Sequence, residues 1–180
     1  MIYKGSLKSK NIYLRMVELT DCNQKYFNWL NDNEVNQFLE TRWSVQTLES
    51  IKNFVEEIRN SDHSYLFAIM KDEKHIGNIK IGPIHKIYKS ADVSYFIGDK
   101  SQWGRGVATE AIKLVTDFGF NTLGLHRLQA GAFEINIGSQ KALEKNGYIK
   151  EATYRKNAFI KQGGEYVNSY VYGILKDEWK

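Results

Sequence analysis

The sequence has few of the residues and patterns that mark several classes of protein. It holds one cysteine, Cys22, so it cannot close an internal disulfide, and no group of Cys and His has the spacing of a zinc site. Its longest apolar runs, such as 65–70, are six residues long, whereas a membrane-spanning helix needs about 20. The first residues lack an apolar segment followed by small residues, so we expect no export signal. These absences predict a protein of the reducing cytoplasm with no metal centre and no membrane span.

Blocks of charge of one sign are also absent. The chain carries 25 Lys and Arg against 21 Asp and Glu, a formal net charge of +4, and its basic residues are scattered among acids and aromatics. A surplus of this size suits a small ligand that carries phosphate. Scattered lysines are more typical of a solvated surface than of a groove for a polyanion. We therefore expect no nucleic-acid partner.

The chain does have the composition of a folded domain, with 42% hydrophobic and 13% aromatic residues. No repeat, low-complexity tract or linker divides it, which predicts one domain over residues 1–180. Alternation predicts a strand at 11–17, and further strands are predicted at 65–70, 75–81, 92–97, 127–132, 148–152 and 166–175. Helical periodicity predicts helices from an N-cap at Thr20 or Asp21 through Leu30, from Thr47 through Ile58, and over 106–120 and 139–145.

This order of elements predicts an α/β domain with a mixed sheet. The pattern predicts antiparallel strands in the first half of the chain and a βαβ-like unit in the second half. The single proline, Pro83, follows Gly82 inside a strand-like run. Because proline removes a ladder donor, we expect a strand end, an edge or a bulge there, with a simple loop as the alternative.

The most informative segment is 102–110, which lies between a predicted strand and the most regular predicted helix. Gly104 and Gly106 allow a tight turn, and the free N–H groups at the start of a helix favour a phosphate. A Walker loop would need Gly-Lys-Ser/Thr where this chain has Gly-Val-Ala. A Rossmann fingerprint would follow the first strand and carry a third Gly or Ala where Thr109 stands. Neither motif fits, and a turn without a ligand stays open as the alternative.

The segment resembles the acetyl-CoA site of the GCN5-related N-acetyltransferase (GNAT) family. Gly106-Val-Ala108 matches the second half of the motif Gln/Arg-x-x-Gly-x-Gly/Ala, and Trp103 stands at its Gln/Arg position, as in the ribosomal-protein alanine acetyltransferase branch. A second signature, Asn-x-x-Ser leading to Glu-Lys-x-Gly-Tyr, is present at 136–139 and 144–148. The resemblance covers essentially the whole chain. It implies a GNAT fold, in which the mixed sheet splays open in the middle and holds the cofactor in the gap.

The resemblance also implies acetyl-CoA as co-substrate and a set of residues that bind it. In the family, the Asn position bonds the pantetheine arm and the Ser position lies near the sulfur, although both residues could simply cap a short helix. Lys141 could approach a cofactor phosphate or be solvated. The expected cofactor-binding residues are Phe96, Ile97, Trp103, Gly104, Arg105, Gly106, Val107, Ala108, Thr109, Asn136, Ser139 and Lys141.

Acetyl transfer needs a neutral amine, a polarised thioester carbonyl and a proton source for the departing thiolate. Leu143 stands where many family members carry a tyrosine as the acid, so Ser139 or an ordered water is the substitute candidate. Asp92 matches the position of a glutamate that this branch often uses as the base, and a surface strand residue is the equal alternative. His75 and His85 are kept in reserve as proton relays.

Acceptor contacts are expected from the early helices, where aromatic residues stand beside hydrogen-bonding groups over 29–43. Such a mixture suits the face and edges of a sugar. Together with residues 75–84, it resembles acetyltransferases that act on nucleotide-linked amino-deoxy sugars of bacterial surface polysaccharides. A helix core is the alternative for Trp29. The expected acceptor-binding residues are Trp29, Asn31, Asp32, Glu34, Phe38, Arg42, His75 and His85.

The leading hypothesis is an acetyl-CoA-dependent N-acetyltransferase that works by direct transfer in a ternary complex, with a nucleotide sugar as acceptor and a homodimer as an option. One alternative is a protein N-terminal or small-amine acetyltransferase. Another is a non-catalytic acyl-CoA sensor, because the expected tyrosine is missing and Asp92 is shorter than glutamate. An acetyl-cysteine intermediate is disfavoured because Cys22 has no obvious base partner.

Overall fold

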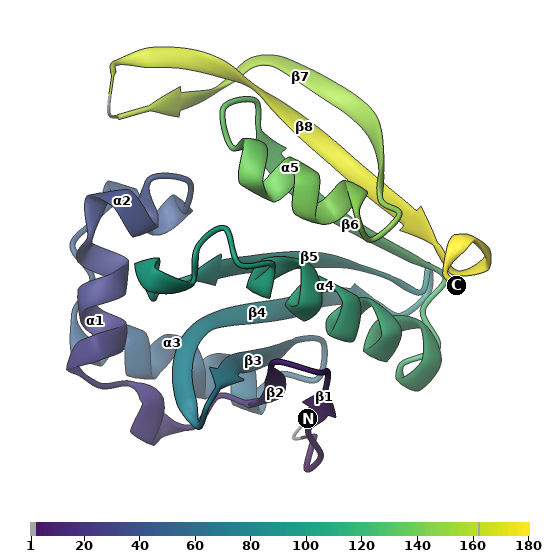
Figure 1. The fold of residues 1–180 in the computed structure, drawn as a ribbon, viewed down its shortest axis with the longest axis horizontal. Coiled ribbons are helices and arrows are strands. Elements are labelled where there is room, and N and C mark those ends of the chain that lie inside the picture. The colour runs from purple at the N-terminus through teal and green to yellow at the C-terminus, as the bar shows by residue number, and fades with distance from the viewer. Residues whose placement is uncertain (1–2, 162) are drawn as a thin grey trace.

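Strands from both halves of the chain join in one eight-stranded mixed sheet within the part that the computed structural model describes, residues 3–161 and 163–180 (Figure 1). The first two residues of the segment judged for an export signal lie outside that part. The strands lie in the order β1-β2-β3-β4-β5-β6-β8-β7. Their bounds are Leu7–Lys8 (β1), Tyr13–Met16 (β2), Tyr65–Lys71 (β3), Lys74–His85 (β4), Ser90–Ile97 (β5), Arg127–Phe133 (β6), Ile149–Ile160 (β7) and Glu165–Leu175 (β8).

Helices cover both faces of this sheet, and each buries an apolar stripe. On one face, α4 packs Ala111, Ile112 and Val115 into a core that includes β2 to β6. On the other face, α1 and α3 pack against Leu66 and other residues of β3. Full burial of each large aliphatic side chain stabilises the fold by about 1.5–3 kcal/mol. The helix bounds are Gln24–Asn31 (α1), Asn33–Asn36 (α2), Leu48–Asn60 (α3), Val107–Asp117 (α4) and Ile137–Glu144 (α5).

The sheet splits between β5 and β6, as the family resemblance implied. These two strands run parallel and pair only where residues 90–92 face 127–129. Beyond Asp92, β5 stays paired with β4 as far as Ile97, while β6 follows β8 through Phe133. The fork opens toward the start of α4 and of α5. The predicted α/β fold class with a GNAT-type mixed sheet is therefore confirmed.

Two predicted boundaries differ from the structure at the first helix and at α4. The first helix begins at Gln24 and is capped by the Asn23 side chain, not by Thr20 or Asp21. Both carboxylate oxygens of Asp21 accept from the guanidinium of Arg15 at 2.7 Å, so this carboxylate is engaged elsewhere. The helix predicted over 106–120 is α-helical only to Asp117 and continues as a π-helical turn over 118–122.

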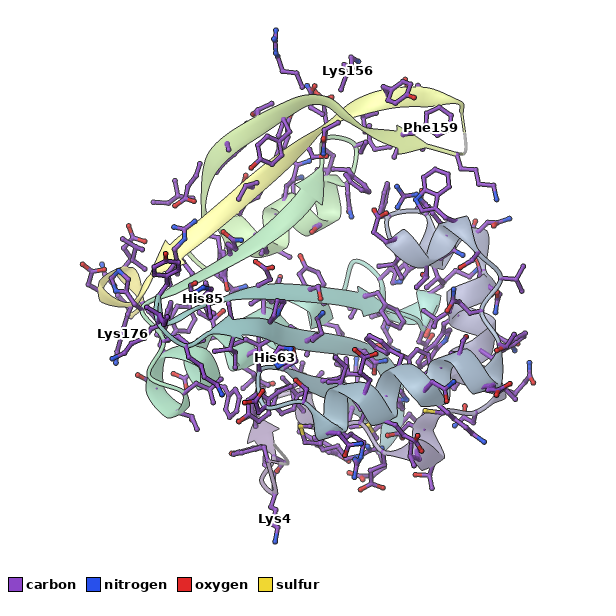
Figure 2. The ribbon with its side chains drawn as sticks, turned by 180° about the vertical axis from the view of Figure 1, so that it is seen from behind. Lys4, His63, His85, Lys156, Phe159 and Lys176 are labelled. Carbon is purple, nitrogen blue, oxygen red and sulfur yellow. The ribbon has the colours of Figure 1, made fainter. Side chains whose placement is uncertain are left out.

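The last hairpin is longer than predicted, because β7 continues well beyond residue 152. A register shift between Tyr154 and Ala158, with Lys156 at a φ of 51°, breaks the alternation that would have revealed the rest of the strand. The Lys156 ammonium donates to the carbonyl of Tyr166 in β8 at 3.0 Å, and Figure 2 shows Phe159 near the far end of this hairpin. The bulge expected near Pro83 is present, since the β4–β5 register shifts between Ile81 and Ile84. Among the described residues, no helix combines the length and apolar character that crossing a bilayer requires.

Candidate active site

The glycine turn before α4 forms an open cradle for a ligand. Gly104 and Gly106 adopt φ values of 73° and 78°, a region that side-chain-bearing residues rarely occupy, and Gly106 is the N-cap of α4. A Cβ placed on either glycine would meet nothing within 4 Å, so both face open space. The first N–H groups of α4 have no partner within the helix, and they carry the positive end of its dipole. This cradle fits a pyrophosphate.

A cavity of about 380 Å³ runs from this cradle into the fork of the sheet. The indole Nε1 of Trp103 donates to the carbonyl of Ile97 at 2.8 Å, which ties the turn to the end of β5. The fork brings together all the expected cofactor-binding residues except Arg105. Those that line the cavity are Phe96, Ile97, Trp103, Gly104, Gly106, Val107, Ala108, Thr109, Asn136, Ser139 and Lys141.

A second cavity, of about 640 Å³, includes residues 93–96 of β5 in its lining. Other lining residues come from α1, α3, β4 and β6. It carries aromatic rings and neutral polar groups, and its charged lining residues are Glu40 and Lys80. The two cavities share Phe38, Leu39, Tyr95, Phe96, Asn136 and Ser139. A long ligand in the first cavity and a smaller one in the second can therefore meet at the fork.

Tyr95 and Ser139 bridge the fork where the cavities meet. Their hydroxyl oxygens lie 2.7 Å apart, so β5 and α5 are joined here by side chains in place of a strand ladder. Burial raises the pKa of Tyr95 to about 12, which keeps its hydroxyl protonated at neutral pH. The Ser139 N–H donates to the Asn136 side chain at 3.2 Å, a cap that also fixes the start of α5. One O–H is used in this bond, so the pair has one further O–H that can be donated to a ligand in the fork.

Tyr95 is not among the candidate site residues predicted from the sequence, yet it lines both cavities. Leu143, at the family's usual tyrosine position, is fully buried in the core. The alternation of β5 places Tyr95 on the same side as Val93, but nothing in the sequence says which side chain crosses the fork.

Asp92 lies outside the lining of both cavities. It is the last β5 residue paired with β6, and its carboxylate accepts from Gln129 Nε2 at 2.6 Å. By strand alternation it shares a face with Ser94, which does line the second cavity. The structure therefore places Asp92 near the fork but not in direct contact with either cavity.

The expected acceptor residues of the early helices are only partly brought together. Phe38 lines both cavities, and Glu34 lines the first. Lys100 forms ion pairs with Glu34 at 2.6 Å and with Asp32 at 2.8 Å, and Asp32 also caps α2. Asn31 accepts from the Gln46 N–H, so it fixes the loop before α3. The structure thus gives Asp32 and Asn31 supporting contacts away from the cavity linings.

Arg42 lies beside the second cavity without lining it. Its guanidinium donates to the carbonyl of Leu39 at 2.7 Å and to Glu40 at 3.2 Å. It also stacks on the ring of Trp43, with 4.5 Å between the guanidinium carbon and the ring centroid. Through these contacts the guanidinium stabilises the 3-10 turn Glu40–Trp43.

Trp29, His75 and His85 likewise lie outside both linings. Trp29 packs in the α1 core against Gly98, where an added Cβ would lie 2.1 Å from the indole ring. His75 is buried beside it, and His85 stacks on Tyr88 at the exposed end of β4, with ring centroids 4.2 Å apart. The helix-core alternative for Trp29 agrees with this packing.

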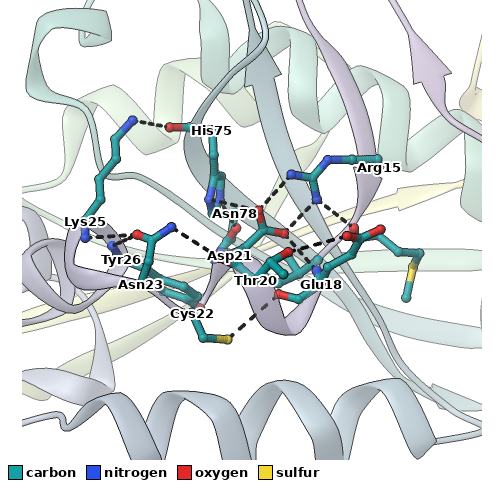
Figure 3. Close-up of polar contacts among 12 residues, drawn as sticks. Arg15, Glu18, Thr20, Asp21, Cys22, Asn23, Lys25, Tyr26, His75 and Asn78 are labelled. Carbon is teal, nitrogen blue, oxygen red and sulfur yellow. Dashed lines mark hydrogen bonds and ion pairs between the residues drawn. The ribbon is translucent and has the colours of Figure 1, made fainter.

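His75 belongs to a buried polar network that ends at the second cavity (Figure 3). One ring nitrogen, Nε2, lies 2.7 Å from the Asn78 side-chain oxygen, and the other, Nδ1, lies 4.0 Å from Asp21. Burial lowers the pKa of His75, which favours the neutral ring. Burial also acts to raise the pKa of Asp21, but hydrogen bonds from Arg15 and from the Glu18 N–H outweigh it and hold that pKa below its usual value.

The sequence reasoning also missed Asn78 and Lys80. Both line the second cavity from β4, and Asn78 is only 2% exposed. Polar residues spaced by two within the otherwise apolar strand Ile76–Ile84 are the signal that could have found them, since alternate residues share one face.

Comparison with known proteins supports the assignment that this geometry suggests. The model of the acetyltransferase (GNAT) domain family matches residues 11–149. The probable N-acetyltransferase YjcK of Bacillus subtilis (strain 168) is 33% identical over 96% of this chain and 98% of its own.

Two solved structures share the fold. Spermidine N-acetyltransferase from Vibrio cholerae, in complex with CoA and spermine, has a TM-score of 0.83 at 20% identity, over 94% of this chain and 98% of its own. Ribosomal-protein-S5-alanine acetyltransferase from Vibrio fischeri has a TM-score of 0.81 at 21% identity, over 98% of this chain and all of its own. The chain belongs to the GNAT acetyltransferase family and is an acetyl-CoA-dependent N-acetyltransferase.

Proposed function

We propose that the enzyme transfers the acetyl group of acetyl-CoA directly to the amino group of a nucleotide-linked amino-deoxy sugar. The observation that carries the direct transfer is the meeting of two cavities at Tyr95 and Ser139, because it lets donor and acceptor react without an acyl-enzyme step. The position of Cys22 also argues against an acetyl-cysteine intermediate, because this residue is buried and lines neither cavity.

In this proposal the cradle at Gly104 and Gly106 binds the pyrophosphate of the donor, and Asn136 binds the pantetheine arm within the fork. Lys141 lines the same cavity and offers a cation to a phosphate. When bound, the donor supplies the acetyl thioester. The residues of the fork hold that thioester between β5 and α5, away from bulk water.

Ser139 and Tyr95 serve as the proton source in this scheme. The Ser139 hydroxyl donates a proton to the departing thiolate, and the neutral Tyr95 hydroxyl replaces it along their 2.7 Å hydrogen bond. Asp92 receives the proton lost by the acceptor amine through intervening water, because its carboxylate lies outside the cavity linings. Tyr95 regains its proton from water before the next turnover, and Asp92 returns the amine proton to water.

The lining of the second cavity favours a sugar over a polyamine. Aromatic rings such as Phe38 and Phe133 offer apolar faces, and amide and hydroxyl side chains offer hydrogen bonds to sugar hydroxyls. Its one carboxylate, Glu40, is engaged by Arg42 and by the Trp43 indole. A polyamine, with several cations, would need more negative charge than this lining provides.

A protein N-terminal amine is the second candidate acceptor. The observation that favours it is the overlay of the whole chain with the Vibrio fischeri ribosomal-protein acetyltransferase. A homodimer and a cytoplasmic location are further parts of the proposal; size-exclusion chromatography with light scattering tests the first and cell fractionation the second.

The acceptor is tested by measuring the release of CoA thiol with a matched panel of amines at fixed acetyl-CoA. The panel holds a nucleotide-linked amino sugar, the free amino sugar, a peptide with an N-terminal alanine, and spermidine. We expect the nucleotide-linked sugar to give the highest kcat/KM. A higher kcat/KM for the peptide or for spermidine would contradict the proposal, and binding of acetyl-CoA without turnover of any amine would identify a sensor.

A further inference from the structure

The acceptor cavity presents hydrogen-bond donors that are not fully paired among the described residues. Thr41 Oγ1 is buried in the lining without a hydrogen bond, and Asn78 Nδ2 has only the Tyr26 hydroxyl beside it, which leaves one of its two N–H groups open. Lys80, also in the lining, forms neither an ion pair nor a hydrogen bond with any described residue. Buried polar groups are normally paired, so donors left open toward a cavity point to a ligand that accepts from them.

The Asn78 amide is held in one orientation by the network of Figure 3. Its side-chain oxygen is bonded to His75, whose ring is fixed in turn between Asp21 and the ring of Trp29. This leaves the N–H₂ end of the amide directed to the side of the Tyr26 hydroxyl, which also lines the cavity. The donor is therefore preorganised, and a ligand loses little free energy in orienting it.

Lys80 stands two residues further along β4, on the same face of the strand as Asn78. The two Cα atoms are separated by about 6.6 Å along such a strand. Lys80 is also paired in register with Ser94, one residue before Tyr95. Its ammonium group can therefore reach a ligand whose other end lies at the fork.

The charge of the cavity is set by Lys80. The other charged lining residue, Glu40, has its carboxylate bonded to Arg42 and Trp43, and its side chain is 79% exposed. Among the described lining residues, no anion offsets the lysine. A half-buried cation next to an open amide donor and an open hydroxyl donor is the arrangement that binds carboxylate and phosphate oxygens.

We propose that the acceptor carries an anionic group, a carboxylate or a phosphate, that binds to Lys80 and Asn78 on the floor of the second cavity while its amine reaches Tyr95 and Ser139. This inference rests on the proposed function, because it assigns the second cavity to the acceptor. It makes Lys80 the residue that selects anionic over neutral amino sugars.

The test compares glucosamine with glucosamine 6-phosphate and with the corresponding 2-amino-2-deoxyuronic acid, which separates phosphate from carboxylate. Acetyl transfer is measured for the wild type, Lys80→Met, Lys80→Arg and Lys74→Met. Lys74 lies on the same strand, is exposed and lines neither cavity, so it controls for loss of surface charge. We expect the wild type to prefer one anionic acceptor by at least about tenfold in kcat/KM.

Lys80→Met should abolish this preference by raising KM for the anionic acceptor, with little change for glucosamine. Lys80→Arg should keep most of the preference, and Lys74→Met all of it. Equal kcat/KM for neutral and anionic acceptors in the wild type, or an undiminished preference in a folded Lys80→Met, would overturn the inference.

A binding measurement separates this inference from the proposed function. Glucosamine 6-phosphate or the uronic acid should raise the melting temperature of the wild type without acetyl-CoA, and Asn78→Ala or Lys80→Met should reduce that shift. If no amine is acetylated but this shift is present, the proposed function fails and the anion site stands. If acetylation occurs and neither anion shifts the melting temperature more than glucosamine does, the anion site fails.

Discussion

At the scale of single residues, the account depends on the Tyr95–Ser139 pair. Removing either hydroxyl should slow the loss of the thiolate while leaving the cradle intact. We expect Tyr95→Phe and Ser139→Ala each to lower kcat about 10²-fold, or about 3 kcal/mol of barrier, with little change in the KM for acetyl-CoA. Because the two act as one relay, the double variant should lose little more than either single one.

Steady-state kinetics on the three variants checks this, with Tyr154→Phe as the control, since Tyr154 is exposed and lines neither cavity. A kcat within twofold of wild type in Tyr95→Phe would remove Tyr95 from the proton path.

Asp92 is tested through the pH dependence of turnover. If it takes up the amine proton through water, Asp92→Asn should keep acetyl-CoA affinity and lower kcat/KM for the acceptor about 10²-fold at neutral pH. The loss should shrink as pH rises, because free amine becomes available without a base. If Asp92→Asn has the same pH–rate profile as the wild type from pH 6 to 9, Asp92 does not take up the amine proton, and its role is limited to the hydrogen bond with Gln129.

At the scale of elements, the proposal assigns the binding of the donor to the turn before α4. Gly106→Ala adds a Cβ to a residue at φ 78°, which costs about 1–2 kcal/mol in strain and places a methyl group in the pyrophosphate cradle. We expect at least a tenfold loss of acetyl-CoA affinity by isothermal calorimetry. Gly124→Ala is the matched control, because Gly124 has a φ of 66°, faces open space and lines neither cavity. Equal acetyl-CoA affinities in Gly106→Ala and Gly124→Ala would show that the pyrophosphate does not bind at this turn.

The elements also show what sequence patterns can and cannot predict. The helix after Thr47 was predicted well because burial of one face imposes a helical period on its residues, and β3 was predicted from a short, continuously apolar run that is buried on both faces. The first helix was given the wrong cap because Asp21 binds Arg15, a contact with a neighbouring strand that local sequence does not reveal. The full length of β7 was missed because a bulge interrupts its alternation.

At the scale of the whole molecule, most residues that line the first cavity were named from the sequence, whereas most of those that line the second were not. The donor cradle is local, since one turn and one helix start supply it. The acceptor cavity is assembled from β4, β5, β6 and the early helices, so Asn78 and Lys80 join it only through tertiary packing. For the same reason, Trp29 and His75 were expected to contact the acceptor, but Trp29 is buried in the α1 core and the His75 side chain, only 10% exposed, packs beside it.

The stability of the whole protein should depend on the protonation of His75. Burial lowers the pKa of His75 in the folded state, whereas in the unfolded chain it lies near 6.5. Below about pH 6.5 the unfolded state therefore binds more protons than the folded state, and the free energy of unfolding falls as pH falls. Urea unfolding at pH 7.5 and 5.5 should show this loss.

His75→Gln should show a smaller loss over the same interval, although the lost contacts should make it about 1–2 kcal/mol less stable at pH 7.5. The other three histidines remain in this variant and provide the internal control. An equal pH dependence in both proteins would show that His75 is not the group responsible.

Direct reaction of donor and acceptor at the fork, where the two cavities meet, requires a ternary complex. Initial rates of CoA release, measured at several concentrations of acetyl-CoA and of the preferred amine, test for that complex. We expect intersecting lines in double-reciprocal plots, and no acetylated enzyme by mass spectrometry after incubation with acetyl-CoA alone. Parallel lines together with an acetyl group on Cys22 would contradict direct transfer.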